Sequence, residues 1–501
     1  QSYAQTGQRA YSQPSLAAAP HQLGQDMAKA AGTAAREQVV CDVEGSSTCT
    51  GDLTQDHSVS FDSSEVGGSA KKPAAGAADS RGLFRHGGTV PTALCLSKAA
   101  IGAGVLSMAA HSAEVGLLYQ LSGLAAGALL TLVSIRMISR ASIETGCWSY
   151  EDICEDVFHP SMSFLTGAIN VCNCLGSGAG YLIVCGQVFQ VATGADEATR
   201  RLFVVLVGVF VCAPLALARH VSFMRHLAAG SVAALLLLVA TVVWYLGANG
   251  QDESVTPKTL WFGPGGATIF TYMNSINNIV FAYNNQFNVP QLTGELTPQP
   301  SVRKMTVISL ITVTLCFALF GGVSIFGVLA FGLGESQRDS LVLDLAPARG
   351  NPLVLASLVS VMFSVLTCFQ FHVYPIRQFA AWAIRKARGR GPDDEKSDIA
   401  YFGRSLTRWF DIASALASVA IIILIAVVVS SLKTILDFIG AFASAYISYV
   451  VPPLWVIQIL RRQKGFAWHS AEALGCLALF SLGAFFFVFG TYSAVRDAFA
   501  R

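Results

Sequence analysis

Apolar stretches long enough to cross a lipid bilayer recur along the chain from about residue 90 to residue 494. One helical crossing needs about 20 apolar residues. Eleven stretches approach or exceed this length, and they are 90–113, 116–138, 163–193, 202–218, 221–247, 267–290, 304–333, 352–380, 408–431, 434–460 and 467–494. Only 13% of the residues are charged, against about 25% in a soluble domain. The pattern predicts an all-α membrane protein with about eleven transmembrane helices in a lipid bilayer.

The distribution of basic residues tests this count and indicates an orientation. Lys and Arg gather in the cytoplasmic loops of membrane proteins. With a cytoplasmic N-terminus, the inner loops hold 17 basic residues and the outer loops hold eight. Without a crossing at 267–290, the basic cluster at 377–408 would fall on the outer side. We therefore expect eleven spans, with the N-terminus in the cytoplasm and the C-terminus on the opposite side.

The chain divides into three expected parts. Residues 1–84 are polar and poor in aromatic residues, which predicts a disordered cytoplasmic tail. Residues 85–495 form the membrane domain, and residues 496–501 form a short C-terminal tail. Within the membrane domain, the loop at 142–160 mixes acidic and aromatic residues. This loop is expected to form a short amphipathic helix on the inner surface.

Motifs for metals, cofactors and catalysis are missing from the sequence. The twelve cysteines form no CxxC pair and show no histidine spacing typical of a zinc site. The sequence contains no HExxH and no GxSxG motif. We expect free thiols, no cofactor or metal, no nucleic-acid partner and no enzymatic activity.

The first apolar stretch contains two features that a simple helix does not need. Gly102, Ala103 and Gly104 form a small patch in mid-span, and glycine weakens a helix there. An unwound backbone survives in a bilayer only where it lines a cavity, although close helix packing also selects small residues. Lys98 lies one turn earlier. A charge inside the membrane is costly and usually functional, unless the side chain reaches the surface by snorkelling.

The sixth stretch carries many amides. Six asparagines fall within fifteen residues, and Gln286 lies among them. Asn277, Phe281, Asn284 and Asn288 share one face if the helix is continuous. Because a buried amide without a partner costs a few kcal/mol, this face is expected to meet water, substrate or unwound backbone. Polar contacts between helices are the alternative.

Interrupted helices at matching places in two halves of a chain indicate a transporter site near the middle of the bilayer. If spans 1–5 and 6–10 are inverted repeats, the first and sixth stretches correspond. Amides at half-helix N-termini attract a carboxylate, and freed carbonyls attract an ammonium group. An amino acid zwitterion carries both groups. In the eighth stretch, His372 is either a proton relay or, as the more ordinary alternative, a satisfied side chain near the membrane boundary, where Pro375 ends or kinks the helix.

Three segments of the chain resemble the amino acid/auxin permease family. They are Ser97–Leu106, Ile279–Pro290 and Tyr374–Arg377, and the resemblance covers roughly residues 85–495. It implies a transmembrane amino acid transporter domain with a LeuT-like 5+5 inverted repeat, in which helices 1 and 6 are broken around the substrate. The candidate substrate-binding residues are Ser97, Ile101, Gly102, Ala103, Gly104, Asn278, Phe281, Asn284 and Asn285. The candidate coupling-ion residues are Lys98, Ser364 and Thr367.

The chain departs from the family's sodium-coupled members, which are similar to this sequence but place Asn where Lys98 stands. The departure favours proton coupling or facilitated exchange over sodium coupling. Neutral amino acids are favoured over cationic ones, because Asp411 and Asp437 lie near span ends and Glu114 lies at the outer end of the first span. The expected partners are an amino acid, a proton and the bilayer of a plasma membrane or a vacuolar or lysosomal-type membrane. An amino-acid sensor that signals through the N-terminal tail is the alternative.

Overall fold

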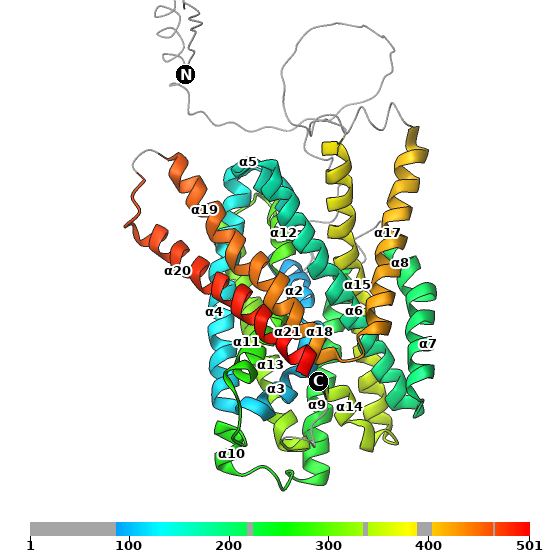
Figure 1. Ribbon diagram of the computed structural model, residues 1–501. Helices are drawn as coiled ribbons and strands as arrows, with labels where there is room; N and C mark the ends of the chain where they lie inside the picture. Colours follow the sequence, from blue (N-terminus) through cyan, green and yellow to red (C-terminus); the bar gives the residue numbers. More distant parts are fainter. Residues whose placement is uncertain (1–86, 218–223, 334–338, 388–402, 464–465, 501) are drawn as a thin grey trace, which may run out of the picture. The chain divides into compact units, whose positions relative to one another are not determined.

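The computed structural model describes residues 87–217, 224–333, 339–387, 403–463 and 466–500. The expected tail at 1–84 therefore lies outside the described residues. The described part is built from helices, and each of the eleven apolar stretches coincides with one helix or with a row of adjoining helices (Figure 1). Single long helices form six of them, namely α4 (Leu117–Thr145), α6 (Pro160–Thr193), α9 (Met224–Asn249), α13 (Val302–Phe331), α15 (Pro352–Ala387) and α17 (Gly403–Val428).

The other five stretches are composite. The first consists of α2 (Thr89–Ala100), η1 (Ala103–Ser107) and α3 (Met108–Val115), and the fourth of α7 (Glu197–Val207), η2 (Gly208–Cys212) and α8 (Ala213–Leu217). The sixth consists of α11 (Ile269–Ala282), η4 (Gln286–Asn288) and α12 (Val289–Gly294). The last two consist of α18 (Leu432–Ile439), η8 (Gly440–Ser444), η9 (Tyr446–Val450) and α19 (Val451–Arg462), and of α20 (Ala471–Phe485), η10 (Phe486–Gly490) and α21 (Thr491–Ala500).

Among the described residues, eight helices are long and apolar enough to cross a membrane, or nine if the bent pair of α2 and α3 is one span. The two remaining stretches are the amide-rich α11 to α12 and α17, in which the shorter apolar helix Ile412–Val428 is found. The all-helical membrane fold is thus confirmed, and eleven crossings remain a prediction.

Outward-facing apolar side chains show how the bundle meets lipid. Leu129 on α4 is 62% exposed, Phe210 in η2 is 71% exposed and Leu424 on α17 is 63% exposed. By contrast, α6 and the row from α18 to α19 are mostly buried. Contacts place α6 against α15, α17 and α18, and they place α11 against α3, α18 and η8. The two interrupted spans therefore lie inside the bundle, where lipid does not reach the broken backbone.

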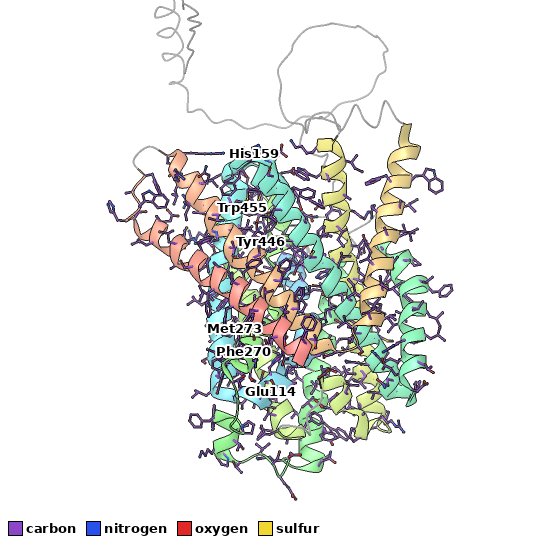
Figure 2. All side chains as sticks on the ribbon, viewed as in Figure 1. Glu114, His159, Phe270, Met273, Tyr446 and Trp455 are labelled. Atoms are coloured by element: carbon purple, nitrogen blue, oxygen red, sulfur yellow. The ribbon has the colours of Figure 1, made fainter. Side chains whose placement is uncertain are left out.

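The short helices mark the two ends of the bundle. Helix α5 (Tyr150–Val157) forms within the predicted amphipathic loop, and Ser149 caps it by accepting a hydrogen bond from the backbone N–H of Asp152 at 3.1 Å. Figure 1 shows α5 at one end, and α10 (Pro257–Phe262) and α14 (Leu341–Asp344) at the other. Figure 2 agrees, because His159 and Glu114 lie at opposite ends. We call these two ends of the bundle the α5 end and the α10 end.

Glu151 on α5 is buried, although an amphipathic surface helix normally turns its acidic residues to water. Its side chain packs near Gly167 of α6, and the residue is only 4% exposed. Burial raises the pKa of Glu151 to about 7. Between about pH 4.5 and pH 7, Glu151 is therefore protonated in the folded chain and already ionised in the unfolded chain.

Glu151→Gln is expected to remove a loss of stability at neutral pH. Because the folded pKa is the higher one, wild-type stability falls as the pH rises through this window, by about 3 kcal/mol in total. The neutral amide has no such titration. Unfolding midpoints in detergent are expected to agree at pH 5 and to be higher for the variant at pH 8. The exposed Glu253→Gln is the control, and equal pH dependence of wild type and Glu151→Gln contradicts the expectation.

Candidate substrate site

The first span breaks at the predicted place. Helix α2 ends at Ala100, and Ile101 and Gly102 have non-helical backbone angles before the 3₁₀ turn η1 begins. The segment Ala103–Val115, which comprises η1 and α3, then continues at an angle of 51° to α2. In place of a continuous helical ladder, the Gly102 N–H donates to the Ala100 carbonyl only two residues back. The break leaves the helical backbone interrupted inside the bundle.

Two glycines in this break allow neighbouring helices to approach the backbone closely. A Cβ on Gly102 would lie 2.8 Å from the hydroxyl of Tyr181 on α6. A Cβ on Gly104 would lie 2.9 Å from the ring of Phe281 on α11. Any larger side chain must displace an aromatic ring at either position. The small patch in the sequence is therefore explained by close contact as well as by the break.

The sixth span breaks as well. Helix α11 ends at Ala282, and a non-helical segment of three residues leads into the 3₁₀ turn η4. Helix α12 then begins with Pro290 in its first turn, where the missing N–H costs nothing. Within the break, the Asn285 N–H donates to the Tyr283 carbonyl. Both predicted interruptions are present in the structure.

The amide side chains of this span do not form one continuous stripe. Asn277 Nδ2 donates to the Gly490 carbonyl in η10 at 3.1 Å, so it joins two helices. Asn284 Nδ2 donates instead to Asn173 Oδ1 on α6 at 2.7 Å. The expected stripe assumed helical periodicity through residues 283–285. Because the helix ends before them, the amides on either side of the break point to different neighbours.

The two breaks lie against each other. The Ser107 hydroxyl in η1 lies within donating distance of Asn278 Oδ1 on α11, at 2.9 Å, and of the Gly104 carbonyl, at 3.1 Å. Phe281 reaches Gly104 from the same helix as Asn278. Three of the candidate substrate-binding residues therefore come from opposite sides of a single junction.

Several polar atoms at this junction are buried without a hydrogen-bond partner among the described residues. They are Ser97 Oγ, Lys98 Nζ, Asn284 Oδ1, Asn285 Nδ2, Asn285 Oδ1 and Gln286 Nε2. Buried polar atoms are almost always paired in native proteins, and each orphan costs about 1–3 kcal/mol. Such a concentration is typical of a site that a polar ligand or water completes.

Lys98 is fully buried, with 0% exposure. Its ammonium lies 5.6 Å from the centre of the Phe371 ring on α15, and Cys368 of the same helix donates to the Lys98 carbonyl at 3.5 Å. The side chain therefore does not snorkel to the surface of the described part. Ser364 and Thr367 are buried one turn or less before Cys368, and Thr367 donates to the Ser364 carbonyl at 2.8 Å.

Three residues at the junction are absent from the candidate site residues, and His372 among them was expected only as a proton relay or a satisfied side chain. Tyr181 contacts Gly102, and its hydroxyl lies 3.5 Å from His372 Nε2. His372 Nδ1 is 3.2 Å from the Cys368 carbonyl, and its ring packs on Phe287. Both ring nitrogens of His372 thus lie near a partner, as expected of a satisfied side chain, and α15 does not end at Pro375 but runs to Ala387. Asn173, the partner of Asn284, is the third residue.

Comparison with known proteins decides the family. Residues 85–495 match the family described as transmembrane amino acid transporter protein. The chain belongs to this family. A vacuolar amino acid transporter 5 of Schizosaccharomyces pombe is 22% identical over 71% of this chain and 81% of its own length. A sodium-coupled neutral amino acid transporter 7 of Danio rerio is 21% identical over 83% of this chain and 88% of its own. The family and these relatives are transporters, not enzymes.

Solved structures resemble this transporter in fold. MhsT in complex with L-phenylalanine has a TM-score of 0.53 and 14% identity, and the match covers 81% of this chain and 98% of that chain. A manganese transporter of Eremococcus coleocola has a TM-score of 0.56 and 13% identity, with 82% and 87% covered. The fold of the described part is thus LeuT-like, as the sequence predicted.

Proposed function

We propose that this transporter moves neutral amino acids by alternating access, and that the substrate is held between the two breaks. The orphaned polar atoms of Ser97, Asn284 and Asn285 carry the proposal, since a zwitterion supplies donors and acceptors for them. The described residues of α2, η1, α11, η4 and α12 include no Asp or Glu. A cationic side chain would therefore find no carboxylate on these five elements, and Glu114 on α3 is paired with Lys433.

We further propose that coupling uses a proton rather than Na⁺. The buried ammonium of Lys98 repels a second cation close to the breaks, and it can exchange a proton there. The family's sodium-coupled members resemble this chain but have Asn at this position. Ser364 and Thr367 belong to the same proposal, because α15 packs on Lys98 and Ile101 through Cys368.

The proposed orientation places the N-terminus and the α5 end in the cytoplasm, with the C-terminus and the α10 end outside. It rests on the excess of basic residues in the inner loops. The membrane is proposed to be a plasma membrane or one of vacuolar or lysosomal type, and a relative named as a vacuolar transporter supports the second choice.

Uptake into vesicles tests the function. The purified chain is reconstituted into liposomes, and uptake of labelled neutral, cationic and acidic amino acids is measured with and without a proton gradient and with and without Na⁺. We expect accumulation of neutral amino acids that follows the proton gradient and ignores Na⁺. Binding without any accumulation contradicts transport and favours a sensor.

Asn285→Leu is expected to weaken substrate binding about 10- to 100-fold, because hydrogen bonds to a charged ligand contribute about 1.5–3 kcal/mol each. Both polar side-chain atoms of Asn285 are buried and have no hydrogen-bond partner in the described part of the chain, so the substitution removes no hydrogen bond that the structure shows. Calorimetric titration gives the affinity, and the thermal midpoint reports folding. Asn277→Leu, which removes a contact to η10, is the comparison and is expected to lower stability more than affinity. Unchanged affinity in Asn285→Leu removes that residue from the site.

A further inference from the structure

Two ion pairs join α3 to α18 on the α10 side of the first break. His111 Nε2 lies 3.2 Å from Asp437 Oδ1, and Lys433 pairs with Glu114. His111 and Glu114 are one turn apart on α3, and Lys433 and Asp437 are one turn apart on α18. Figure 2 places Glu114 toward the α10 end. The two pairs therefore form two successive contacts between the same two half-helices.

The two pairs differ in their access to water. The side chains of His111 and Asp437 are 0% and 3% exposed, whereas those of Lys433 and Glu114 are 6% and 37% exposed. Beyond their mutual contact, neither ring nitrogen of His111 and neither carboxylate oxygen of Asp437 has a hydrogen-bond partner among the described residues. The His111–Asp437 pair is therefore removed from water, and no further hydrogen bond from the described residues stabilises its charge.

The surroundings bring few other charges to this pair. The elements packed on α3 and α18 are α4, α6, α11, α13, α21, η1 and η8. Of these, α6, α11, η1 and η8 contain no Asp, Glu, Lys, Arg or His. The charged residues of α4 and α13 lie near the ends that face away from α3, toward the α5 end. Helix α21 brings Arg496 and Asp497, and the Arg496 guanidinium lies 3.9 Å from the centre of the Phe270 ring.

The charge of the four-residue cluster depends on one proton. Lys433 contributes one positive charge, and Glu114 and Asp437 contribute one negative charge each. With neutral His111 the cluster has a net charge of −1, and with one more proton on the His111–Asp437 pair it is neutral. A buried net charge is costly, whereas a neutral, paired cluster is tolerated. The closed contact between α3 and α18 therefore favours the protonated cluster.

We propose that the His111–Asp437 pair is the outer proton-binding site of this transporter, and that the bound proton holds α3 against α18 over the substrate junction. The inference rests on the proposed proton coupling and orientation, and it adds the place where the proton enters. Without that proton, the desolvated carboxylate of Asp437 is stabilised by water between the helices. Helix α3 can move because the break at Ile101 and Gly102 separates it from α2. Closure over the amino acid then requires the proton.

The first test compares pH profiles of uptake. Vesicles containing the full chain take up labelled leucine at outer pH 5.5 to 7.5, with the inner pH fixed. Wild-type uptake is expected to rise at least about fivefold as the outer pH falls. His111→Gln and Asp437→Asn are each expected to flatten this ratio to below about twofold, and the double variant is expected to behave like either single one, because the pair acts as one unit.

Two further variants test the charge argument. They leave His111 and Asp437 in place, so the test does not depend on whether the buried pair can be substituted without unfolding the protein. Glu114→Gln removes a negative charge, so the unprotonated cluster becomes neutral and the midpoint of the pH profile moves to lower pH. Lys433→Gln removes the positive charge, so the midpoint moves to higher pH. Each displacement is expected to be roughly one pH unit. Shifts in the same direction, or no shift in either variant, overturn the proposal.

Proton counting separates this inference from the proposed function. Calorimetric titration of leucine in two buffers of different ionisation enthalpy gives the protons bound with the substrate. Wild type is expected to take up about one proton near pH 6.5, and His111→Gln close to none, with leucine still bound. If the wild type transports leucine together with a proton, and His111→Gln and Asp437→Asn have the same pH profile as the wild type, then only the assignment of the outer proton site is overturned. A wild type that neither transports nor takes up a proton overturns the proposed proton-coupled function, and the inference with it.

Discussion

Gly102→Val is expected to reduce both substrate binding and transport by at least about 100-fold. The first added carbon would lie 2.8 Å from the Tyr181 hydroxyl and 3.0 Å from its ring. Tyr181 has little room to retreat, because it is buried and its ring packs edge-on against His372. The overlap therefore forces the unwound backbone away from α6 and changes the junction between the breaks. Overpacking typically costs 1–3 kcal/mol, and about 2.7 kcal/mol corresponds to 100-fold in affinity.

The control for this variant is Gly230→Val on α9, where, apart from the neighbouring backbone of the same helix, no atom of the described residues lies within 4 Å of the added carbon. Leucine affinity is measured by calorimetry and uptake in vesicles, with the thermal midpoint as a check on folding. Gly102→Ala is expected to fall between the wild type and the valine variant. Wild-type affinity in Gly102→Val would mean that the substrate is not held at the first break.

Lys98→Met is expected to abolish the response of transport to a proton gradient and to lower uptake at least about tenfold. The ammonium is fully buried and has no hydrogen-bond partner among the described residues, so its desolvation is costly. Because an apolar side chain of similar length removes this cost, the variant is expected to be at least as stable as the wild type. Loss of function with retained stability distinguishes a coupling group from a structural one.

Internal pH, followed with a fluorescent dye during amino acid uptake, measures this loss of coupling. Lys258→Met on α10 is the control, because Lys258 is exposed. Wild-type uptake and wild-type acidification in Lys98→Met at every outer pH would remove Lys98 from the coupling mechanism.

The position of the first break could be predicted from local sequence, because Gly102 and Gly104 weaken the helix where it is interrupted. A break in the sixth span was expected from its correspondence with the first, but the amide stripe assumed a continuous helix where α11 in fact ends at Ala282. Length and hydrophobicity likewise placed the eight helices of the described part that are long and apolar enough to cross a membrane, and the bent pair of α2 and α3. The position of a span or of a helix interruption depends mainly on the residues of that short segment itself, so a single sequence is enough to predict it.

The identity of the neighbours could not be predicted in the same way. Asn173 and Tyr181 belong to an apolar span, and their partners Asn284 and His372 are more than 100 residues away. Helical periodicity does not say which of these distant elements a face will meet. The sequence placed an end or a kink of the eighth span at Pro375, and α15 continues through it to Ala387. The loop at 142–160 was expected to form an amphipathic helix on the inner surface, and packing against α6 buries Glu151 of that helix.

The central claim is that the backbone and amides at the two breaks hold the ammonium and carboxylate groups common to amino acids. The most direct measurement is the affinity of the full chain for leucine, leucine methyl ester and N-acetyl-leucine. Loss of either charged group is expected to weaken binding at least about 100-fold, since about two hydrogen bonds to a charged group are lost. Shortening the side chain to valine removes one CH₂ group, worth about 0.8 kcal/mol when buried, and is expected to cost less than about tenfold. Equal affinity for leucine and its methyl ester would contradict the claim.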